Sequence, residues 1–507
     1  MLNQNTHKSR KHSAMLINDS VYQDPELGPW TLPRFRVCPN CNEQVAVIPR
    51  KKGVRVPVSG PAGTVPVEIV YRASCCSKCG KIICEREFDT QYAKQAPAQY
   101  KKITGQELPT LAPIDNRMIY LDHAATTRLD DEALSVMQQY YQIDYANPST
   151  PYSFSETARA ALNDARKTIA DAIGADSPEE IIFTSGGTES DNTALKGIAF
   201  KELLKIPQQK GLDTGSKVGY HCHIITTAIE HHAVLRACQF LERIGCTVSY
   251  LPVTREGIVK PEVLANMLRH HPDTKLVSIM MANNEIGTIE PIQELAAIAH
   301  EYHALFHTDA VQAVGHIPID VNAQGIDLLS ASAHKFNGPK GVGFLYVRNG
   351  VDFEPLLHGG AQEADRRAGT ENVPAIAGMA TALKRHNDRL VSTMGYLFSL
   401  QDKLVNCLRD HGVDFIINGG SNRLPGSLSL SIKGVEGANL LRHLDLMNIE
   451  IAVGSACDSQ NAQQSHVITA IDIPKDYIKG TIRITLGLDN TYEEMAYVAA
   501  QIADIVS

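Results

Sequence analysis

The stretch SASAHKFNGPKGVG, residues 330–343, places a lysine directly behind a histidine and among the smallest side chains available. Burial of a lysine is costly, and the preceding Ser and Ala residues leave room for another molecule beside it. An amine in such a place can form a Schiff base with an aldehyde, because burial lowers the pKa of a lysine toward that role. Lys335 is therefore a candidate nucleophile toward a carbonyl group.

Three further features precede Lys335, and each follows a predicted strand. TSGGTES, residues 184–190, is a Gly-rich turn that opens a helix, where free backbone N–H groups and the positive helix end can bind a phosphate. His231, in AIEHHAVL, could stack on a planar cofactor. Asp309, in FHTDAVQAVG, could keep a heterocyclic nitrogen protonated. Taken singly, each has a plain structural alternative: a tight turn, a core or capping histidine, and an N-cap carboxylate.

The four features together carry more weight than any one of them. Phosphate turn, histidine, aspartate and lysine follow one another in the order that a pyridoxal phosphate site needs. Strands alternate with amphipathic helices from Met118 onward, which predicts a mostly parallel sheet. Open α/β sheets bind ligands at the carboxyl ends of their strands. The sequence therefore predicts a pyridoxal phosphate site, in which the aspartate makes the cofactor ring an electron sink.

From about Met118 to Ser507, the chain also resembles the class V aminotransferase group of fold-type I pyridoxal phosphate enzymes, and more narrowly the cysteine desulfurases of the NifS/IscS type. The matching stretches are YLDHAATT, NPSTPYSF, FTSGGTESDN, EHHAV, NNEIGTIEPI, HTDAVQAVG, SAHKFNGPKGVGFLY, RRAGTENV, GSAC and IRITLG. They are spread over about 77% of the chain. The resemblance implies an α/β fold of type I, with a large domain on a mostly parallel central sheet and a smaller α+β C-terminal domain.

The resemblance implies a role for each matching residue. Lys335 would form the Schiff base with the cofactor and later move the α-proton of the substrate. His231 would stack on the ring, and Asp309 would pair with the pyridine nitrogen. The residues expected to contact the cofactor phosphate are Gly187, Thr188, Ser332 and His334. The residues expected at the ring oxygen and the substrate are Gln312, Asn284 and Arg483, of which Arg483 would clamp the substrate carboxylate.

Cys457 is the residue that distinguishes a desulfurase from its relatives. A lone cysteine is most often a small buried hydrophobe, but VGSACDSQNAQQSHV surrounds this one with small and polar residues, which predicts an exposed, mobile loop. A thiol on such a loop suits a nucleophile that must travel. In the family, the corresponding cysteine attacks the sulfur of the bound substrate and becomes a persulfide, leaving alanine.

The resemblance also implies a homodimer, because the threonine corresponding to Thr370 reaches the phosphate of the neighbouring subunit in the family. The sequence departs from the family pattern at His123 and at Asp458, which follows the cysteine where Thr or Ser is usual. A negative neighbour disfavours a thiolate, so Asp458 is expected to slow the attack or to alter the choice of acceptor.

The first part of the chain has no counterpart in a typical family member. Six of the 11 cysteines lie between Cys38 and Cys84. Two C-x2-C pairs flank short predicted strands, QVAVIP and VPVEIVYR, and predict a zinc ribbon, in which the metal replaces a core too small to fold alone. The expected ligands are Cys38, Cys41, Cys76 and Cys79. Iron in a rubredoxin-like site, unpaired thiols, and Cys75 in place of Cys76 are the alternatives.

Composition and charge narrow the class of protein. The 507 residues contain no apolar run of membrane-spanning length and no apolar segment of a secretory signal near the start, so we expect a cytoplasmic protein without a disulfide framework. Residues 1–115 contain 16 Lys and Arg against 10 Asp and Glu, a net charge of +6. Because the whole chain has a net charge of −8, the remaining residues carry a net charge of −14. An ordinary solvated surface explains this asymmetry more simply than nucleic-acid binding does.

These observations predict five segments and one activity. The segments are a disordered tail (1–30), a zinc-ribbon-like module (31–90), a linker (91–115), a pyridoxal phosphate-binding large domain (116–373) and a small C-terminal domain with the cysteine loop (374–507). The predicted activity converts L-cysteine to L-alanine and passes the persulfide to a sulfur-acceptor protein. The alternatives are another class V activity, such as transamination or selenocysteine lysis, and a retired enzyme scaffold that binds nucleic acid or protein. Transamination needs no mobile thiol, which argues against the first alternative. A retired site would have no chemical use for all four of Lys335, Asp309, His231 and Cys457, which argues against the second.

Overall fold

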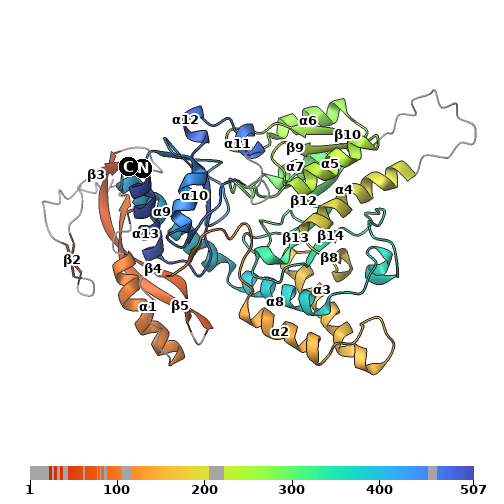
Figure 1. Cartoon of the computed structure of the whole chain (residues 1–507), viewed down its shortest axis with the longest axis horizontal. Coiled ribbons are helices and arrows are strands. Elements are labelled where there is room, and N and C mark those ends of the chain that lie inside the picture. The colour runs from red at the N-terminus through yellow and green to blue at the C-terminus, as the bar shows by residue number, and fades with distance from the viewer. Residues whose placement is uncertain are drawn as a thin grey trace, which may run out of the picture. The chain divides into compact units, whose positions relative to one another are not determined.

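The computed structural model describes residues 22–24, 28–30, 35–37, 44–60, 63–76, 78–79, 82–84, 88–105, 114, 117–204, 222–454 and 465–507. The chain separates into two compact units, Met1–Thr110 and Leu111–Ser507 (Figure 1). None of the described helices has the length and apolar character needed to cross a membrane.

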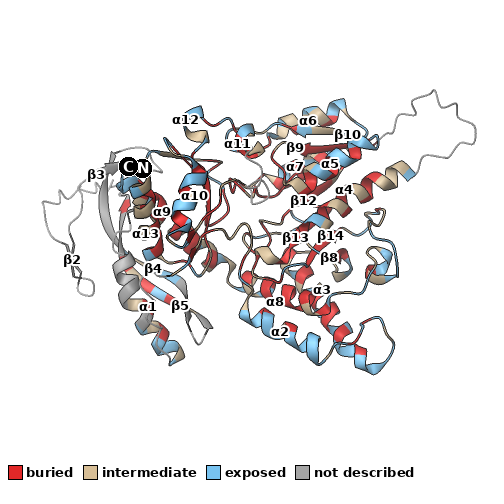
Figure 2. Cartoon of the chain, in the orientation of Figure 1, coloured by how far each residue is buried: buried red, intermediate tan, exposed pale blue. Residues whose placement is uncertain are grey.

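The larger unit is built on a seven-stranded sheet in the order β10-β9-β11-β12-β13-β14-β8, in which only β14 runs against the others. The strands are β8 (Ile181–Thr184), β9 (His223–Thr227), β10 (Thr247–Leu251), β11 (Thr274–Ser278), β12 (Leu305–Asp309), β13 (Leu328–Ser332) and β14 (Gly343–Val347). Strands β8, β9, β13 and β14 are buried along their whole length, as Figure 2 shows and as expected of a sheet covered on both faces. The predicted mostly parallel sheet is confirmed.

Helices cover both faces of this sheet, because successive strand residues point to opposite sides. Ile225 packs in a core with helices α3, α6, α7 and α8, while its neighbour Ile224 packs in a second core with α4 and α5. The helices of this part are α2 (Asp131–Gln142), α3 (Glu156–Ile173), α4 (Gly187–Leu204), α5 (His232–Arg243), α6 (Pro261–His270), α7 (Ile292–Glu301) and α8 (Val373–Asp388). Helix α8 thus packs with the large sheet, although the sequence predicts it at the start of the small domain.

The small C-terminal part is an antiparallel sheet, β15-β16-β18, with helices around it. A second pairing joins β17 in parallel to β7, a strand from the beginning of this unit. The elements are β7 (Ile119–Tyr120), α9 (Leu390–Asp410), β15 (Phe415–Ile417), β16 (Ser427–Ile432), α10 (Gly437–Asp445), β17 (Ile449–Glu450), α11 (His466–Ala470), α12 (Lys475–Ile478), β18 (Thr481–Thr485) and α13 (Tyr492–Val506). The predicted α+β domain is therefore present.

The N-terminal unit contains a four-stranded antiparallel sheet in the order β3-β4-β5-β6. Both strands predicted here are parts of one long hairpin, which pairs continuously from Val47 with Cys76 to Gly60 with Gly63. The elements are β1 (Tyr22–Asp24), β2 (Gly28–Trp30), β3 (Phe35–Val37), β4 (Gln44–Gly60), β5 (Gly63–Cys76), β6 (Ile82–Cys84) and α1 (Phe88–Thr104).

Two sequence expectations differ from the structure of this unit. Most of the expected linker is helix α1, which packs on β5: the amide groups of Gln95 and Gln99 each pair with both backbone groups of one strand residue, Val70 and Glu68. These contacts cover part of the edge of β5, a position that sheets commonly protect. The expected disordered tail includes the antiparallel pair β1 and β2 near its end.

Candidate active site

The carboxyl ends of the large sheet's strands surround a cavity of about 260 Å³. Ten of the residues predicted for the cofactor and substrate line it: Gly187, Thr188, His231, Asn284, Asp309, Gln312, Ser332, His334, Lys335 and Arg483. They come from six different places in the sequence, so the fold itself brings them together.

Lys335 ends the short 3₁₀ helix η4 (Ala333–Lys335), which follows β13 directly. Its Nζ donates hydrogen bonds to the backbone carbonyls of Ala124 (2.5 Å) and Ala125 (3.0 Å). Gln312 Nε2 donates to the same Ala124 carbonyl (3.0 Å). Because these acceptors fix the end of a flexible side chain, the amine is held in place at the wall of the cavity.

Asp309 is the last residue of β12 and is almost fully buried. Its Oδ1 accepts a hydrogen bond from the Val311 backbone N–H (2.9 Å). Burial raises the pKa of Asp309 to about 6, although that hydrogen bond and the charge of Lys335 both favour the anion. A buried carboxylate of this kind can pair with a protonated ring nitrogen.

His231 serves two purposes. It is the N-cap of α5, where its Nδ1 accepts a hydrogen bond from the Ala233 N–H (3.2 Å), and it also lines the cavity. The capping interpretation considered for the sequence is thus correct, and it fixes the ring at the place where a planar cofactor would stack.

The turn between β8 and α4 presents a close-fitting cradle. Gly186 has φ +143°, a conformation that residues with a side chain rarely adopt. A Cβ on Gly187 would lie 2.5 Å from Val311 Cγ2, so any larger residue would force the Val311 side chain or the turn to shift. His334 lies nearby and bonds through Nδ1 to Thr126 Oγ1 (3.1 Å). Burial, and then the charges of two lysines, lower the pKa of His334 to about 4, so its ring is neutral at pH 7.

Arg483, in β18, is 3% exposed and is held by two acceptors. Its Nη2 donates to Asp122 Oδ1 (2.6 Å) and its Nη1 to the Asn284 carbonyl (3.1 Å), while Nε is buried without a hydrogen-bond partner. A guanidinium fixed in this way, with a donor still unpaired, suits a ligand carboxylate.

Two predicted residues of the active site are not among the cavity-lining set. Thr370 is exposed, and Cys457 lies outside the described residues, which stop at Gly454 and resume at Ser465. The segment before Cys457 begins beside the cavity, because Ala452 exchanges both backbone hydrogen bonds with Arg483 (3.0 and 2.7 Å).

Of the four predicted zinc ligands, Cys38 and Cys41 lie outside the described residues. Cys76 ends β5, and Cys79 is exposed in the turn that follows. Cys75, the alternative ligand, is fully buried.

The cavity also contains residues that the sequence analysis missed. The carbonyls of Ala124 and Ala125 could not be found from side-chain chemistry. Asp191 lies in α4, four residues after Gly187, and this spacing puts both on one face of the helix. That spacing was a signal, but a charged residue near a helix start is usually exposed.

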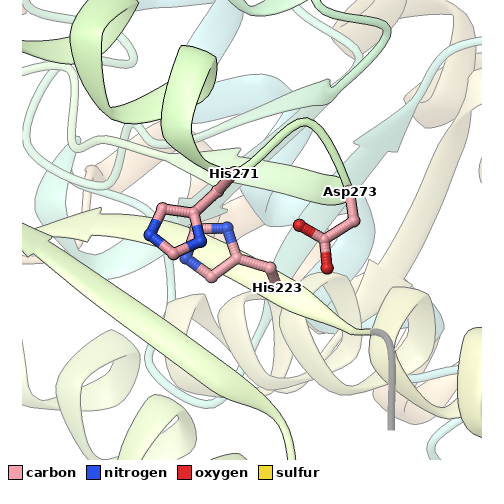
Figure 3. A group of neighbouring side chains, drawn as sticks. All are labelled: His223, His271 and Asp273. Carbon is pink, nitrogen blue, oxygen red and sulfur yellow. The ribbon is translucent and has the colours of Figure 1, made fainter. Parts of the chain in front are cut away.

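Three residues of types that can bind a metal ion, His223, His271 and Asp273, lie together away from this cavity (Figure 3). The two imidazoles are stacked, with centroids 4.2 Å apart and planes at 23°. Both ring nitrogens of His223 already bond to hydroxyls, those of Thr274 (2.7 Å) and Ser249 (2.9 Å). Because a metal lies in the plane of each imidazole that binds it, nearly parallel stacked rings do not converge on one ion.

The residues of the cavity fit pyridoxal phosphate. The Gly187 cradle, which a Cβ would fill, opens onto the first turn of α4, where a phosphate is favoured. A held amine and a buried carboxylate supply the partners that the aldehyde and the ring nitrogen require.

Comparison with known proteins gives one consistent result. The profile "Aminotransferase class-V" matches residues 119–498. "Cysteine desulfurase IscS" of Dictyoglomus turgidum is 50% identical over 382 residues, which are 75% of this chain and 92% of the relative. The solved structure "NIFS-LIKE PROTEIN" is similar with a TM-score of 0.68 and 37% identity, over 77% of this chain and 99% of the other. "SspA in complex with cysteine" is similar with a TM-score of 0.62 and 36% identity, over 73% and 98%.

Proposed function

The chain belongs to the class V aminotransferase family and, within it, to the cysteine desulfurases, and from this premise we propose which of its residues carry out the reaction. The enzyme uses pyridoxal phosphate and takes L-cysteine as its substrate. When bound, the cofactor supplies an electron sink for the bond changes at the substrate carbon atoms.

Lys335 is the residue that binds the cofactor aldehyde and moves the proton at the substrate α-carbon. The two backbone carbonyls that hold its Nζ orient the amine toward the cavity. Asp309 would keep the ring nitrogen protonated, and His231, fixed as the N-cap of α5, would lie against the ring. The first turn of α4, with Ser332 and His334, takes the phosphate.

Arg483 binds the substrate carboxylate. Its charge is held at the cavity by Asp122 and by the Asn284 carbonyl, and its Nε still needs an acceptor. Binding of the carboxylate there would orient the substrate side chain relative to Lys335, since both residues line one cavity.

Cys457 is the nucleophile that takes the sulfur. Its thiolate attacks the substrate sulfur, a new S–S bond forms, the C–S bond of the substrate breaks, and the carbon left behind takes a proton to become alanine. Ala452 is paired with Arg483, and five extended residues reach roughly 17 Å. The Cys457 thiol can therefore reach the cavity. Transfer of the sulfur to a separate acceptor protein also requires a thiol that can travel.

The observation that carries this proposal is the convergence of ten predicted residues on one cavity, combined with a cysteine segment that begins beside it. Release of sulfide and alanine from L-cysteine, with a thiol reductant present, tests it in the wild type and in Cys457→Ala. We expect equal amounts of both products from the wild type and neither from the variant. Undiminished products from the variant would overturn the role of Cys457.

A homodimer explains the exposed position of Thr370, which lies outside the cavity of its own chain. The loop that carries Thr370 is tied to its own subunit by the bidentate pair of Arg166 and Glu363 (2.7 and 2.8 Å) and by Arg367 with Glu189 (2.9 Å). A loop fixed in this way could present a hydroxyl to the phosphate of a second copy.

The N-terminal unit holds zinc and docks the sulfur acceptor, a protein or a nucleic acid. Val37 pairs with Gln44 and Val47 pairs with Cys76, so β3, which ends just before Cys38, and β5, which ends at Cys76, finish at the same end of one sheet. Four thiolates brought together there suit a tetrahedral zinc ion. Metal analysis of the purified protein tests the site: stoichiometric zinc is expected, and Cys79→Ser should lose it. Iron in its place, or no metal, would contradict this assignment.

A further inference from the structure

Asp191 is a second buried carboxyl group close to Asp309. It is 1% exposed, lies in the first turns of α4 and lines the active-site cavity. Carboxylate oxygens of Asp191 and Asp309 and a ring nitrogen of His231 all lie within 4.8 Å of one another. Asp191 Oδ1 is buried and has no hydrogen-bond partner. An unpaired buried carboxylate oxygen is costly, and the cost is lower when the carboxyl group binds a proton and becomes neutral.

The surroundings of Asp191 offer a chain of neutral groups. Ser278 Oγ bonds to His307 Nδ1 (2.8 Å), and His307 Nε2 bonds to Ser330 Oγ (3.0 Å). The Ser330 hydroxyl is the hydrogen-bond partner of Asp191. Burial lowers the pKa of His307 to about 3, so this ring is neutral and contributes no positive charge, although its Nε2 lies 3.7 Å from Asp191 Oδ1.

Four titratable groups face Asp191: His307 and Asp309 from β12, and Glu230 and His231 from the turn before α5. Of these, the two carboxyl groups disfavour its anion. Burial first, and then the charges of Asp309 and Glu230, raise the pKa of Asp191 well above its ordinary range. Asp309 differs, because a backbone N–H and the charge of Lys335 favour its ionised form.

Resting on the proposed function, in which Asp309 pairs with the cofactor ring nitrogen, we propose that Asp191 is a positioning residue that works as the neutral carboxylic acid. Two carboxylates this close in a dry site do not both ionise, and the proton resides on Asp191. Asp309 would then remain the single anion available to the ring nitrogen, which would have one charged partner instead of two.

The protonation state can be read directly in the cofactor-loaded enzyme by infrared difference spectroscopy at pH 7. We expect a carboxylic-acid C=O stretching band in the wild type that is absent from Asp191→Asn. The buried acid Glu290 lies outside the cavity, so Glu290→Gln serves as the matched control and should lose a band of its own. If Asp191→Asn lost no such band, Asp191 would be an anion and the proposal would be overturned. Asp191, Asp309 and His231 would then form a candidate cation site instead.

The positioning role is read from the pH titration of the cofactor absorbance. Asn keeps the size and the hydrogen bonding of a neutral acid, so Asp191→Asn should titrate within about half a pH unit of the wild type. Asp191→Leu should shift the midpoint by about one unit or more, because it removes the partner of Ser330 and leaves Asp309 beside an apolar group. An equal shift in both variants would overturn the proposal. Failure of the proposed function itself would appear differently, as a wild type without cofactor absorbance or without products.

Discussion

At the scale of single residues, the site works through side chains whose charge is set by burial. His334 is neutral, and the Val311 N–H and the charge of Lys335 favour the anion of Asp309, while the Arg483 guanidinium is held in place by Asp122 and the Asn284 carbonyl. The contacts that hold these side chains join residues far apart in the sequence, as between Arg483 and Asp122. Two predictions belong to this scale.

Arg483→Lys keeps the positive charge but removes the fork that pairs with Asp122, the Asn284 carbonyl and the substrate carboxylate. Loss of charged hydrogen bonds costs about 1.5–3 kcal/mol, so we expect the KM for L-cysteine to rise about tenfold to a hundredfold, with a smaller change in kcat. Steady-state kinetics measures this. An unchanged KM would show that another group binds the carboxylate.

Glu290 gives a pH dependence of stability whose sign can be worked out. It is 5% exposed, and burial raises its pKa to about 8, although its Oε2 accepts the Val259 N–H (3.0 Å). The folded state therefore holds a proton that the unfolded state loses near pH 4.5, and this contribution to stability falls as pH rises from about 4.5 to 8.

Glu290→Gln lacks this titration and retains the acceptor for Val259. The stability of the variant relative to the wild type should therefore increase with pH across that window, by up to about 1.4 kcal/mol per pH unit, and level off above pH 8. Tm measured at a series of pH values tests this. A Tm difference that is constant with pH would contradict the buried, protonated state of Glu290.

At the scale of elements, the approach of helix to strand shapes the cofactor cradle. In Gly187→Ala, the new Cβ would meet Val311 Cγ2 at 2.5 Å. Crowding of this kind costs about 1–3 kcal/mol, so cofactor affinity should fall about tenfold or more. Gly395→Ala, in α9, is the matched control: its Cβ meets nothing within 4 Å, and it should raise stability by about 0.5–1 kcal/mol without weakening cofactor binding. Equal cofactor affinity in both variants would contradict the cradle.

The elements also show what the sequence could predict. Continuous apolar runs in the sequence predicted the buried strands of the sheet. The residues that follow these runs predicted the lining of the cavity, because a parallel sheet brings the carboxyl ends of its strands to one edge. Helix α1 was missed: its described buried apolar residues are only Ala96 and Tyr100, one turn apart, and two glutamines attach it to β5. Asp191 was missed because burial of a carboxyl group depends on partners that no local pattern displays.

At the scale of the whole molecule, the chain has two compact units, Met1–Thr110 and Leu111–Ser507. The family profile matches residues 119–498, which lie in the larger unit, and the IscS relative of Dictyoglomus turgidum is covered over 92% of its length by 75% of this chain. Deletion of residues 1–110 should therefore leave sulfide release within about twofold, a change below 1 kcal/mol, and should reduce transfer to the acceptor. Sulfide release measured with and without an acceptor tests this. An equal loss of both would show that the N-terminal unit is structural.

The proposed homodimer belongs to the same scale. Thr370→Ala should weaken cofactor binding by about tenfold to a hundredfold, the value of one lost hydrogen bond to a charged group, without changing the molecular mass in solution. Equilibrium dialysis and analytical ultracentrifugation measure the two quantities. A monomeric wild type, or an unchanged cofactor affinity, would rule out this role for Thr370.

The most direct test of the account is the fate of the substrate's sulfur atom. The enzyme is mixed with L-cysteine without reductant, digested, and the mass of the peptide that contains Cys457 is measured. We predict that this peptide gains one sulfur atom in the wild type and that the corresponding peptide of Cys457→Ser does not. Formation of alanine with no added sulfur on Cys457, or with the sulfur on another cysteine, would contradict the account.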